Sequence, residues 1–334
     1  MTTQKTASAL IDGLSTVIRG KRERLELFTA AYLSGGHVLL EDVPGIGKTT
    51  LAKTLAHLVG VRASKSRKAL APVSFRRIQF TPDLLPYDIT GVDVFNPKER
   101  RFEFVPGPIF SDILLADEIN RTTPKVQSAL LEVMAERQVS VGGTTRSVND
   151  VFFVVATQNP VETEGTYPLP AAQLDRFMIR LSLGYPDPAA EIHLLREDPS
   201  NALLPTITPL VSVDDVRASR VEQSRVFCHP ALERAIVEIA GATRDHPSLK
   251  LGLSPRGALQ LLHAARALAL IRGRAWIADT DILDLSVPVV AHRLVARERT
   301  VAINDLVTRI ATDTLRSVER KTDWSEAAAP HGQR

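Results

Sequence analysis

The chain has 334 residues, a length that suits two domains better than one. Hydrophobic residues make up 44% of it and charged residues 24%, close to the averages of globular proteins, so a largely disordered chain is excluded. Only 5% of the residues are aromatic and the net charge is +3, which argues against a base-stacking RNA platform and a dedicated nucleic-acid coat protein.

Five short apolar runs in the first half of the chain predict β-strands. They are residues 37–40, 75–80, 113–116, 151–157 and 177–183. Between them, stretches such as 48–58 and 124–136 are apolar at helical spacing. Strand, helix and strand in this rhythm predict right-handed crossovers and a parallel sheet that is covered on both faces. We therefore expect an α/β domain over residues 1–184.

Three stretches of this half stand apart from the rhythm. Residues 91–110 contain Asn96-Pro97 between two short runs, which predicts a hairpin inserted between the second and third strands. Residues 139–148 are a second candidate hairpin. Residues 62–72 resemble an insertion, and their basic part, 62–68, is expected to be an exposed loop.

Helical patterns dominate the second half of the chain. They cover residues 189–197, 230–243, 255–272, 280–295 and 303–319. These patterns predict a separate all-helical domain over 185–320, followed by a flexible tail, 321–334. The apolar run 258–271 is too short to span a membrane, and the single Cys228 excludes an internal disulfide. We expect a soluble, cytoplasmic protein without membrane insertion.

A phosphate-binding loop follows the first strand. Residues 42–49 match the pattern G-x-x-x-x-G-K-[ST], except that Asp42 stands where the first glycine is usual. The two glycines let the backbone approach a phosphate chain, Lys48 brings a cation to the β- and γ-phosphates, and the Thr49 hydroxyl is a hard ligand for Mg²⁺. The residues expected to bind ATP are Gly45, Ile46, Gly47, Lys48, Thr49 and Thr50.

Two carboxylates end the strand 113–116. Asp117 is expected to hold Mg²⁺ together with Thr49, and Glu118 to polarise a water molecule aimed at the γ-phosphate. Asn159 follows the strand 151–157, where it could position that water. An ordinary acidic turn, and for Asn159 a turn formed with Pro160, are the alternatives.

Together these motifs resemble AAA+ ATPases of the MoxR family, over about residues 17–293. The segments that carry the resemblance are 39–49, 77–86, 107–110, 116–121, 156–160, 174–177, 253–256 and 292–293. The resemblance implies a five-stranded parallel sheet in the order 5-1-4-3-2, a helical lid, and a homo-oligomeric ring, usually hexameric, with ATP between the subunits. It also implies hydrolysis of ATP with Mg²⁺.

The resemblance implies roles for two arginines. Arg176 would be the arginine finger that reaches the γ-phosphate of the neighbouring subunit, and Arg256 the lid arginine that contacts the phosphate bound by its own subunit. A surface salt bridge for Arg176 and a solvated first helical turn for Arg256 are the alternatives. Arg121 could also face the neighbour. Ile18 and Gly20, before the first helix, resemble a segment that contacts the edge of the adenine base. Ordinary packing against a helix is the alternative.

The function implied by the resemblance is ATP-driven remodelling of a protein client, often a von Willebrand factor A-domain partner, during assembly or maturation. The two hairpins would contact the client; the alternative is that their apolar residues only pack the hairpins against the domain. The alternatives are a nucleic-acid motor, a magnesium-chelatase-like motor subunit and a nucleotide-dependent scaffold without turnover. The low net charge and the few aromatic residues disfavour nucleic acid as a partner. Residues 79–83 favour the MoxR family over a chelatase subunit. Glu118 and Asn159, which suit ATP hydrolysis, disfavour a scaffold without turnover.

Overall fold

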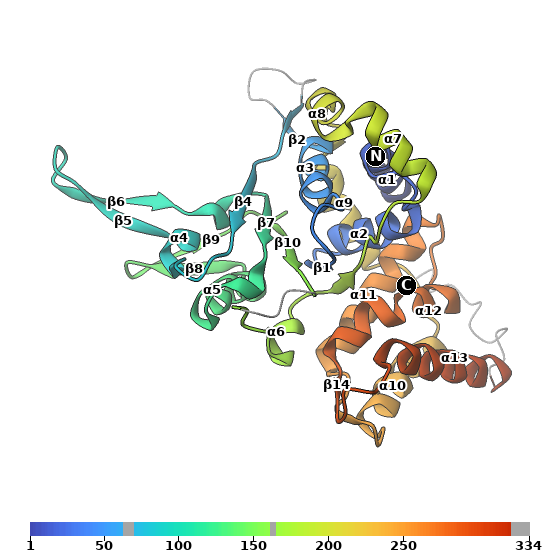
Figure 1. Ribbon diagram of the computed structural model, residues 1–334. Helices are drawn as coiled ribbons and strands as arrows, with labels where there is room; N and C mark the ends of the chain where they lie inside the picture. The colour runs from blue at the N-terminus through green and yellow to red at the C-terminus, as the bar shows by residue number, and fades with distance from the viewer. Residues whose placement is uncertain (63–69, 161–164, 322–334) are drawn as a thin grey trace, which may run out of the picture. The chain divides into compact units, whose positions relative to one another are not determined.

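The computed structural model describes residues 1–62, 70–160 and 165–321. It forms two compact units, one that ends at Val221 and one that begins at Glu222 (Figure 1). Of the expected basic loop, residues 63–68 lie outside the described ranges, as do residues 322–334 of the expected tail. The domain boundaries expected at residues 184 and 320 stay a prediction.

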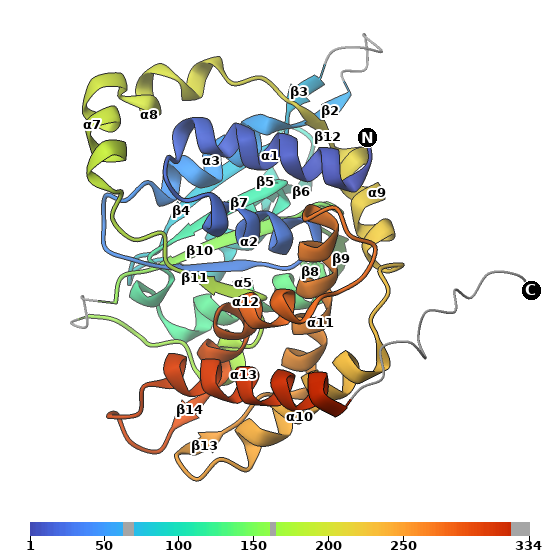
Figure 2. The same ribbon diagram turned by 90° about the vertical axis from the view of Figure 1, so that its right-hand side faces the viewer.

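The first unit is built on a five-stranded parallel sheet in the order β11-β1-β10-β7-β4 (Figure 2). The strands are β1 (Val38–Glu41), β4 (Phe75–Gln79), β7 (Ile113–Asp117), β10 (Phe153–Gln158) and β11 (Ile179–Leu181). Numbered along the chain, this order is 5-1-4-3-2, so the expected topology is confirmed. Because the strands are parallel, their carboxyl ends share one edge of the sheet.

Helices cover both faces of this sheet. They are α1 (Thr3–Val17), α2 (Arg22–Leu33), α3 (Lys48–Leu58), α4 (Pro86–Thr90), α5 (Pro124–Glu136), α6 (Ala171–Leu174), α7 (Pro188–Glu197), α8 (Pro199–Ala202) and α9 (Val213–Gln223). On one face, Leu114 and Val154 join a buried cluster with Leu130 of α5. On the other, Phe153 meets Phe28 of α2 edge to face, with ring centroids 5.6 Å apart. Alternate side chains of neighbouring residues thus fill both sides of the sheet.

The N-terminal part differs from the sequence expectation. A helix, α1, precedes Ile18, whereas the sequence placed the first helix after it. The buried side chains Ala7, Leu10, Ile11 and Leu14 recur on one face of α1, so a helical pattern was present there. A small three-stranded sheet was also missed, formed by β2 (Val59–Arg62), β3 (Leu70–Pro72) and β12 (Val211–Ser212).

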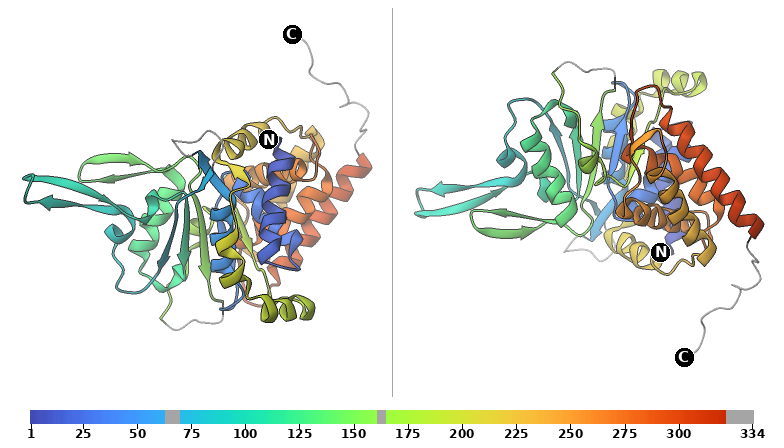
Figure 3. Two further views of the ribbon diagram at one scale, coloured as in Figure 1. Left: turned by 90° about the horizontal axis from the view of Figure 1, so that it is seen from above. Right: turned by 90° about the horizontal axis from the view of Figure 1, so that it is seen from below.

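Both expected hairpins are present. They are formed by β5 (Gly91–Asn96) with β6 (Arg101–Pro106), and by β8 (Gln138–Val141) with β9 (Thr144–Ser147). They extend on the same side of the first unit (Figure 3). The Arg146 guanidinium lies 3.9 Å from the centroid of the Phe104 ring and joins the two hairpins. Farther along, the Phe95 and Phe102 rings pair at 5.4 Å, and Phe102 is 70% exposed.

The second unit is mainly helical. It contains α10 (Pro230–Arg244), α11 (Pro255–Ile271), α12 (Asp279–Val290), α13 (Ile303–Lys321) and an antiparallel pair, β13 (Leu249–Leu251) with β14 (Val295–Ala296). Its core includes Leu268 of α11, Leu285 of α12 and Val307 of α13, all buried. Among the described residues of the chain, no helix combines the length and apolar character that a membrane crossing requires.

Candidate functional site

A pocket of about 630 Å³ lies in the first unit, at the carboxyl ends of the parallel strands. All five strands contribute to it, at their last residues or just beyond them. The contributing positions are Gln79 at the end of β4, residues 44–50 in the loop after β1 and the start of α3, Asp117 and Glu118 at the end of β7, Asn159 after β10 and Leu183 after β11. Ligands of open parallel sheets bind at this edge, so the pocket is where the fold places a functional site.

The phosphate-binding loop forms one wall of the pocket. Gly45 and Gly47 have φ angles of 86° and 92°, a left-handed conformation that glycine adopts without a steric penalty. A Cβ atom on Gly47 would also lie 3.2 Å from Ile18 Cδ1. Lys48 begins helix α3 directly after Gly47, so the helix N-terminus points its free N–H groups at the loop.

Lys48 is held by the loop itself. Its Nζ donates to the backbone oxygen of Asp42 at 2.6 Å and to that of Val43 at 3.3 Å. Burial lowers the pKa of Lys48, while the carboxylates of Asp42, Asp117 and Glu118 act in the opposite direction. Lys48 thus lines the pocket with its ammonium group bonded to the loop, where it feels the charges of Asp117 and Glu118.

Those two carboxylates are positioned by a buried threonine. The Thr157 hydroxyl donates to Asp117 Oδ1 at 2.6 Å and accepts from the backbone N–H of Glu118 at 2.8 Å. Glu118 has a φ of 58° and a ψ of 50°, a left-handed conformation that is uncommon outside glycine and asparagine. Such backbone strain is concentrated at functional sites.

Strand β4 supplies two further partners that sequence reasoning did not assign. Arg77 donates through Nη2 to Asp117 Oδ2 at 2.6 Å, and Gln79 donates through Nε2 to Glu118 Oε2 at 2.6 Å. Both side chains line the pocket. They were identifiable in principle, because residues two apart on a strand point to the same face and β4 pairs with β7.

Most of the expected site residues meet in the pocket. Its lining includes Gly45, Ile46, Gly47, Lys48, Thr49, Thr50, Asp117, Glu118, Asn159 and Ile18. Arg121 and Gly20 are not among the described residues of this lining. Arg121 instead approaches Glu118 of its own chain, with Nε 3.2 Å from Oε2.

The two expected arginines lie outside the lining. Arg176 donates through Nη1 to the backbone oxygen of Ala172 at 2.9 Å and is not among the described residues of the pocket wall. Arg256 belongs to the second unit, where it is exposed in the first turn of α11. Ser254 caps that helix by accepting from the Gly257 N–H at 3.0 Å.

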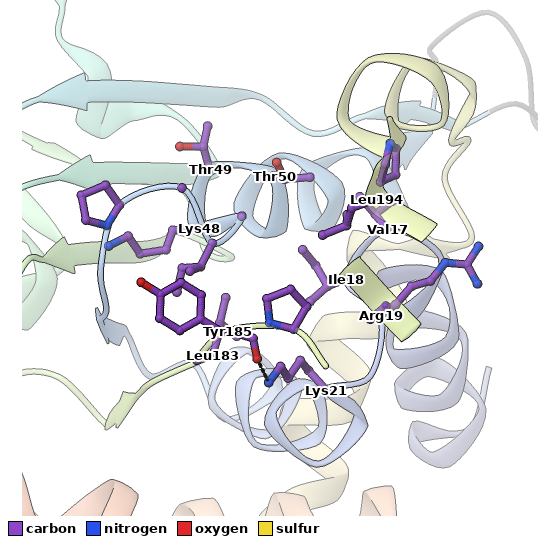
Figure 4. A pocket seen from close by; sticks show the side chains of 18 of the residues that line it. Val17, Ile18, Arg19, Lys21, Lys48, Thr49, Thr50, Leu183, Tyr185 and Leu194 are labelled. Atoms are coloured by element: carbon purple, nitrogen blue, oxygen red, sulfur yellow. Dashed lines mark hydrogen bonds between the residues drawn. The ribbon is translucent and has the colours of Figure 1, made fainter. Parts of the chain in front are cut away.

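The other end of the pocket is apolar, and most of it was not foreseen. Val17, Ile18, Leu183, Tyr185 and Leu194 line it (Figure 4). Lys21 Nζ donates to the backbone oxygen of Tyr185 at 2.7 Å and holds the connector between β11 and α7 in place. The pocket therefore combines a cationic, phosphate-binding wall with an apolar end that suits a flat ring system.

Comparisons with known proteins agree with this geometry. Residues 37–179 match the family described as ATPase family associated with various cellular activities (AAA), and residues 241–311 match the AAA lid domain. The chain is 46% identical over 284 residues to the uncharacterised protein YeaC of Bacillus subtilis, covering 85% of each chain. It is 41% identical over 288 residues to chaperone MoxR1 of Mycobacterium tuberculosis, covering 84% of this chain and 73% of that one.

A solved structure gives the same result for the fold. It is that of a protein from Cytophaga hutchinsonii proposed to be an ATPase, which is 35% identical to this chain. The TM-score is 0.80, over 96% of this chain and 95% of the other.

Proposed function

The chain belongs to the MoxR family of AAA+ ATPases, and from this we propose that it is a Mg²⁺-dependent, ring-forming ATPase that remodels a protein client. That it is an ATPase with a chaperone-like role follows from the family; the metal, the ring and the client are the proposed part. The observation that carries the proposal is the pocket, in which the loop 44–50 faces Asp117, Glu118 and Asn159.

The residues of the pocket divide the chemistry among them. Lys48 and the N–H groups of the loop neutralise the phosphate charge, Glu118 accepts a proton from the attacking water, and Asn159 orients that water. Gln79 and Arg121 both contact Oε2 of Glu118 and would orient its carboxylate.

A magnesium ion fits the oxygen donors that are present. The Thr49 hydroxyl and the Asp117 carboxylate both line the pocket, and one or two hard oxygen ligands plus phosphates are the usual Mg²⁺ environment. Bound there, the ion would offset charge on the phosphates. Arg77, which now bonds Asp117 Oδ2, would have to release that oxygen.

We propose that the site is completed by a second copy of the chain. Arg176 is half-buried, lies outside the lining of its own pocket and donates to the Ala172 carbonyl of its own chain, so acting on the neighbouring subunit is the role that we propose for it. A guanidinium there stabilises charge on the transferred phosphoryl group. Arg256 is proposed as the lid arginine, and the ring as a hexamer.

The client is proposed to be a protein, because chaperone MoxR1 is a relative. A von Willebrand factor A-domain protein is the first candidate, as the family resemblance of the sequence implies. The exposed pair Phe95 and Phe102 on the β5–β6 hairpin offers apolar surface for such a client. We propose that it acts in the cytoplasm, where ATP is available as fuel. The basic segment 63–68, the feature of the sequence that would favour a nucleic-acid motor, lies outside the described ranges.

A trapping variant tests this function. Glu118→Gln keeps the size of the side chain but removes the base, so we expect kcat for ATP hydrolysis to fall by about 10²-fold or more while ATP binding persists. The variant, loaded with ATP and Mg²⁺, should retain client proteins in a pull-down. Glu132→Gln, an exposed glutamate on α5, is the matched control, and Lys48→Ala should lose ATP binding. Undiminished turnover in Glu118→Gln would contradict the proposal.

A further inference from the structure

Asp42 occupies the position at which the phosphate-loop pattern usually has glycine. Its backbone N–H continues the β1–β10 ladder by donating to the Gln158 oxygen at 3.2 Å. Asp42 is not among the residues with positive φ, so the backbone here does not require glycine. The side chain at this position is therefore available for another task.

That side chain is a buried carboxylate, 6% exposed, whose oxygens bind the connector after β11. Oδ1 accepts from the Ser182 hydroxyl at 2.7 Å and from the Gly184 N–H at 3.2 Å, and Oδ2 accepts from the Leu183 N–H at 2.6 Å. Burying a carboxylate is unfavourable unless hydrogen bonds compensate it, and three consecutive residues supply them here. The connector is thus fastened to the start of the phosphate loop.

The same residue contacts both ends of the pocket. Through its backbone oxygen, Asp42 accepts from Lys48 in the phosphate-binding wall. Through its carboxylate it holds Leu183, and the chain that follows contributes Tyr185 and Leu194 to the apolar end. Asp42 therefore links the two ends, alongside the bond from Lys21 to Tyr185 and the pairing of β1 with β11.

We infer that Asp42 is a positioning residue for nucleotide binding, which fixes the apolar end of the pocket relative to the phosphate loop so that base and triphosphate bind together. The inference rests on the proposed use of this pocket for ATP. Pre-organisation of two subsites raises the affinity for a ligand that spans both, and leaves the affinity for a ligand that fills only one unchanged.

The test compares ATP with inorganic tripolyphosphate, which lacks the base, by calorimetric titration of the full chain in Mg²⁺. In Asp42→Gly, which restores the usual glycine, we expect the Kd for ATP to rise about tenfold and the Kd for tripolyphosphate to change less than about twofold. Ser182→Ala removes one donor and should give a smaller change in the same direction. Asp214→Asn, an exposed carboxylate on α9, is the control.

A second readout does not depend on any ligand. Hydrogen exchange of the Leu183 and Gly184 amides should be faster in Asp42→Gly than in the wild type, because their acceptor is gone. Unchanged ATP affinity in Asp42→Gly, equal losses for both ligands, or unchanged exchange would each overturn the inference. If Asp42→Gly does not fold, Ser182→Ala decides by the same measurements. Wild-type protein that binds neither ligand would instead refute the proposed function.

Discussion

Thr157 illustrates how much of the site depends on a side chain that does not touch substrate. It is 1% exposed, and its hydroxyl connects Asp117 with the backbone of Glu118. The left-handed conformation of Glu118 leaves its N–H pointing away from the strand, and Thr157 is the partner that satisfies it. A buried N–H without an acceptor would be costly, so Thr157 stabilises the strained geometry.

We predict that Thr157→Val lowers kcat by about 10- to 100-fold, since valine has a similar shape but cannot accept from Glu118 or donate to Asp117. Steady-state ATPase assays at saturating ATP measure this. Thr157→Ser retains the hydroxyl and loses only a methyl group, so its kcat should stay within about threefold of that of the wild type. A fall of equal size in both variants would show that packing, not the hydroxyl, matters.

Of the individual site residues, the sequence revealed only those that belong to contiguous motifs. The loop 44–50 and the pair Asp117 and Glu118 are contiguous motifs, so they could be recognised without knowing the fold. Arg77, Gln79 and Thr157 were not assigned, because they reach the carboxylates through the pairing of β4, β7 and β10, and only the expected strand order could have pointed to them. Strand pairing is a long-range property that no local pattern encodes.

Among the elements, the helices of the second unit depend on one buried carboxylate. Asp281 in the first turn of α12 is 0% exposed and accepts from Arg272 Nη1 at 3.0 Å, from Arg274 Nη2 at 2.6 Å and from the Ala278 N–H at 2.9 Å. These bonds tie the end of α11 to the start of α12. Two arginines and one amide offset the burial of the charge.

We predict that Asp281→Ala lowers the free energy of unfolding of the second unit by about 3–5 kcal/mol, because two guanidinium groups lose their buried partner. Asp284→Ala is the control: that side chain is 46% exposed and pairs with Arg272 at the surface, so its loss should cost about 1 kcal/mol or less. Urea unfolding, with hydrogen exchange of the α11 and α12 amides, measures both. Equal effects would contradict the prediction.

Element prediction succeeded where the pattern was long or the strand fully buried. All five strands of the parallel sheet, both hairpins, helix α7 and helices α10 to α13 were expected, whereas α8 and α9 were not. The sheet of β2, β3 and β12 was missed because its strands have two to four residues and take their pairing from distant segments. Short edge pairings of this kind are decided by tertiary contacts rather than by propensity.

At the scale of the whole molecule, function is proposed to require more than one chain. The pocket contains the loop, Asp117, Glu118 and Asn159 from one subunit, and the proposal supplies Arg176 from another. Sequence motifs suggested this division only through family resemblance, since no pattern in a single chain states which copy a side chain serves.

We predict that Arg176→Ala lowers kcat by about 10³-fold, and that mixing it with Glu118→Gln restores part of the activity. In a mixed ring, an Arg176→Ala subunit keeps its own Glu118 and can receive Arg176 from a Glu118→Gln neighbour. ATPase rates across mixing ratios should pass through a maximum. Purely additive rates at every ratio would place Arg176 in its own subunit's site or outside catalysis.

Strand β4 connects the candidate site directly to the β5–β6 hairpin. Its last residues hold Asp117 and Glu118, and the chain then runs through Phe80–Thr90 directly into the root of the β5–β6 hairpin. Phe80 and Ile89, near the two ends of that segment, are packed in the same buried cluster, so the segment is held in place at both ends. A load on the hairpin would therefore reach Arg77 and Gln79, which contact the two carboxylates, along a short segment whose ends are packed into the core.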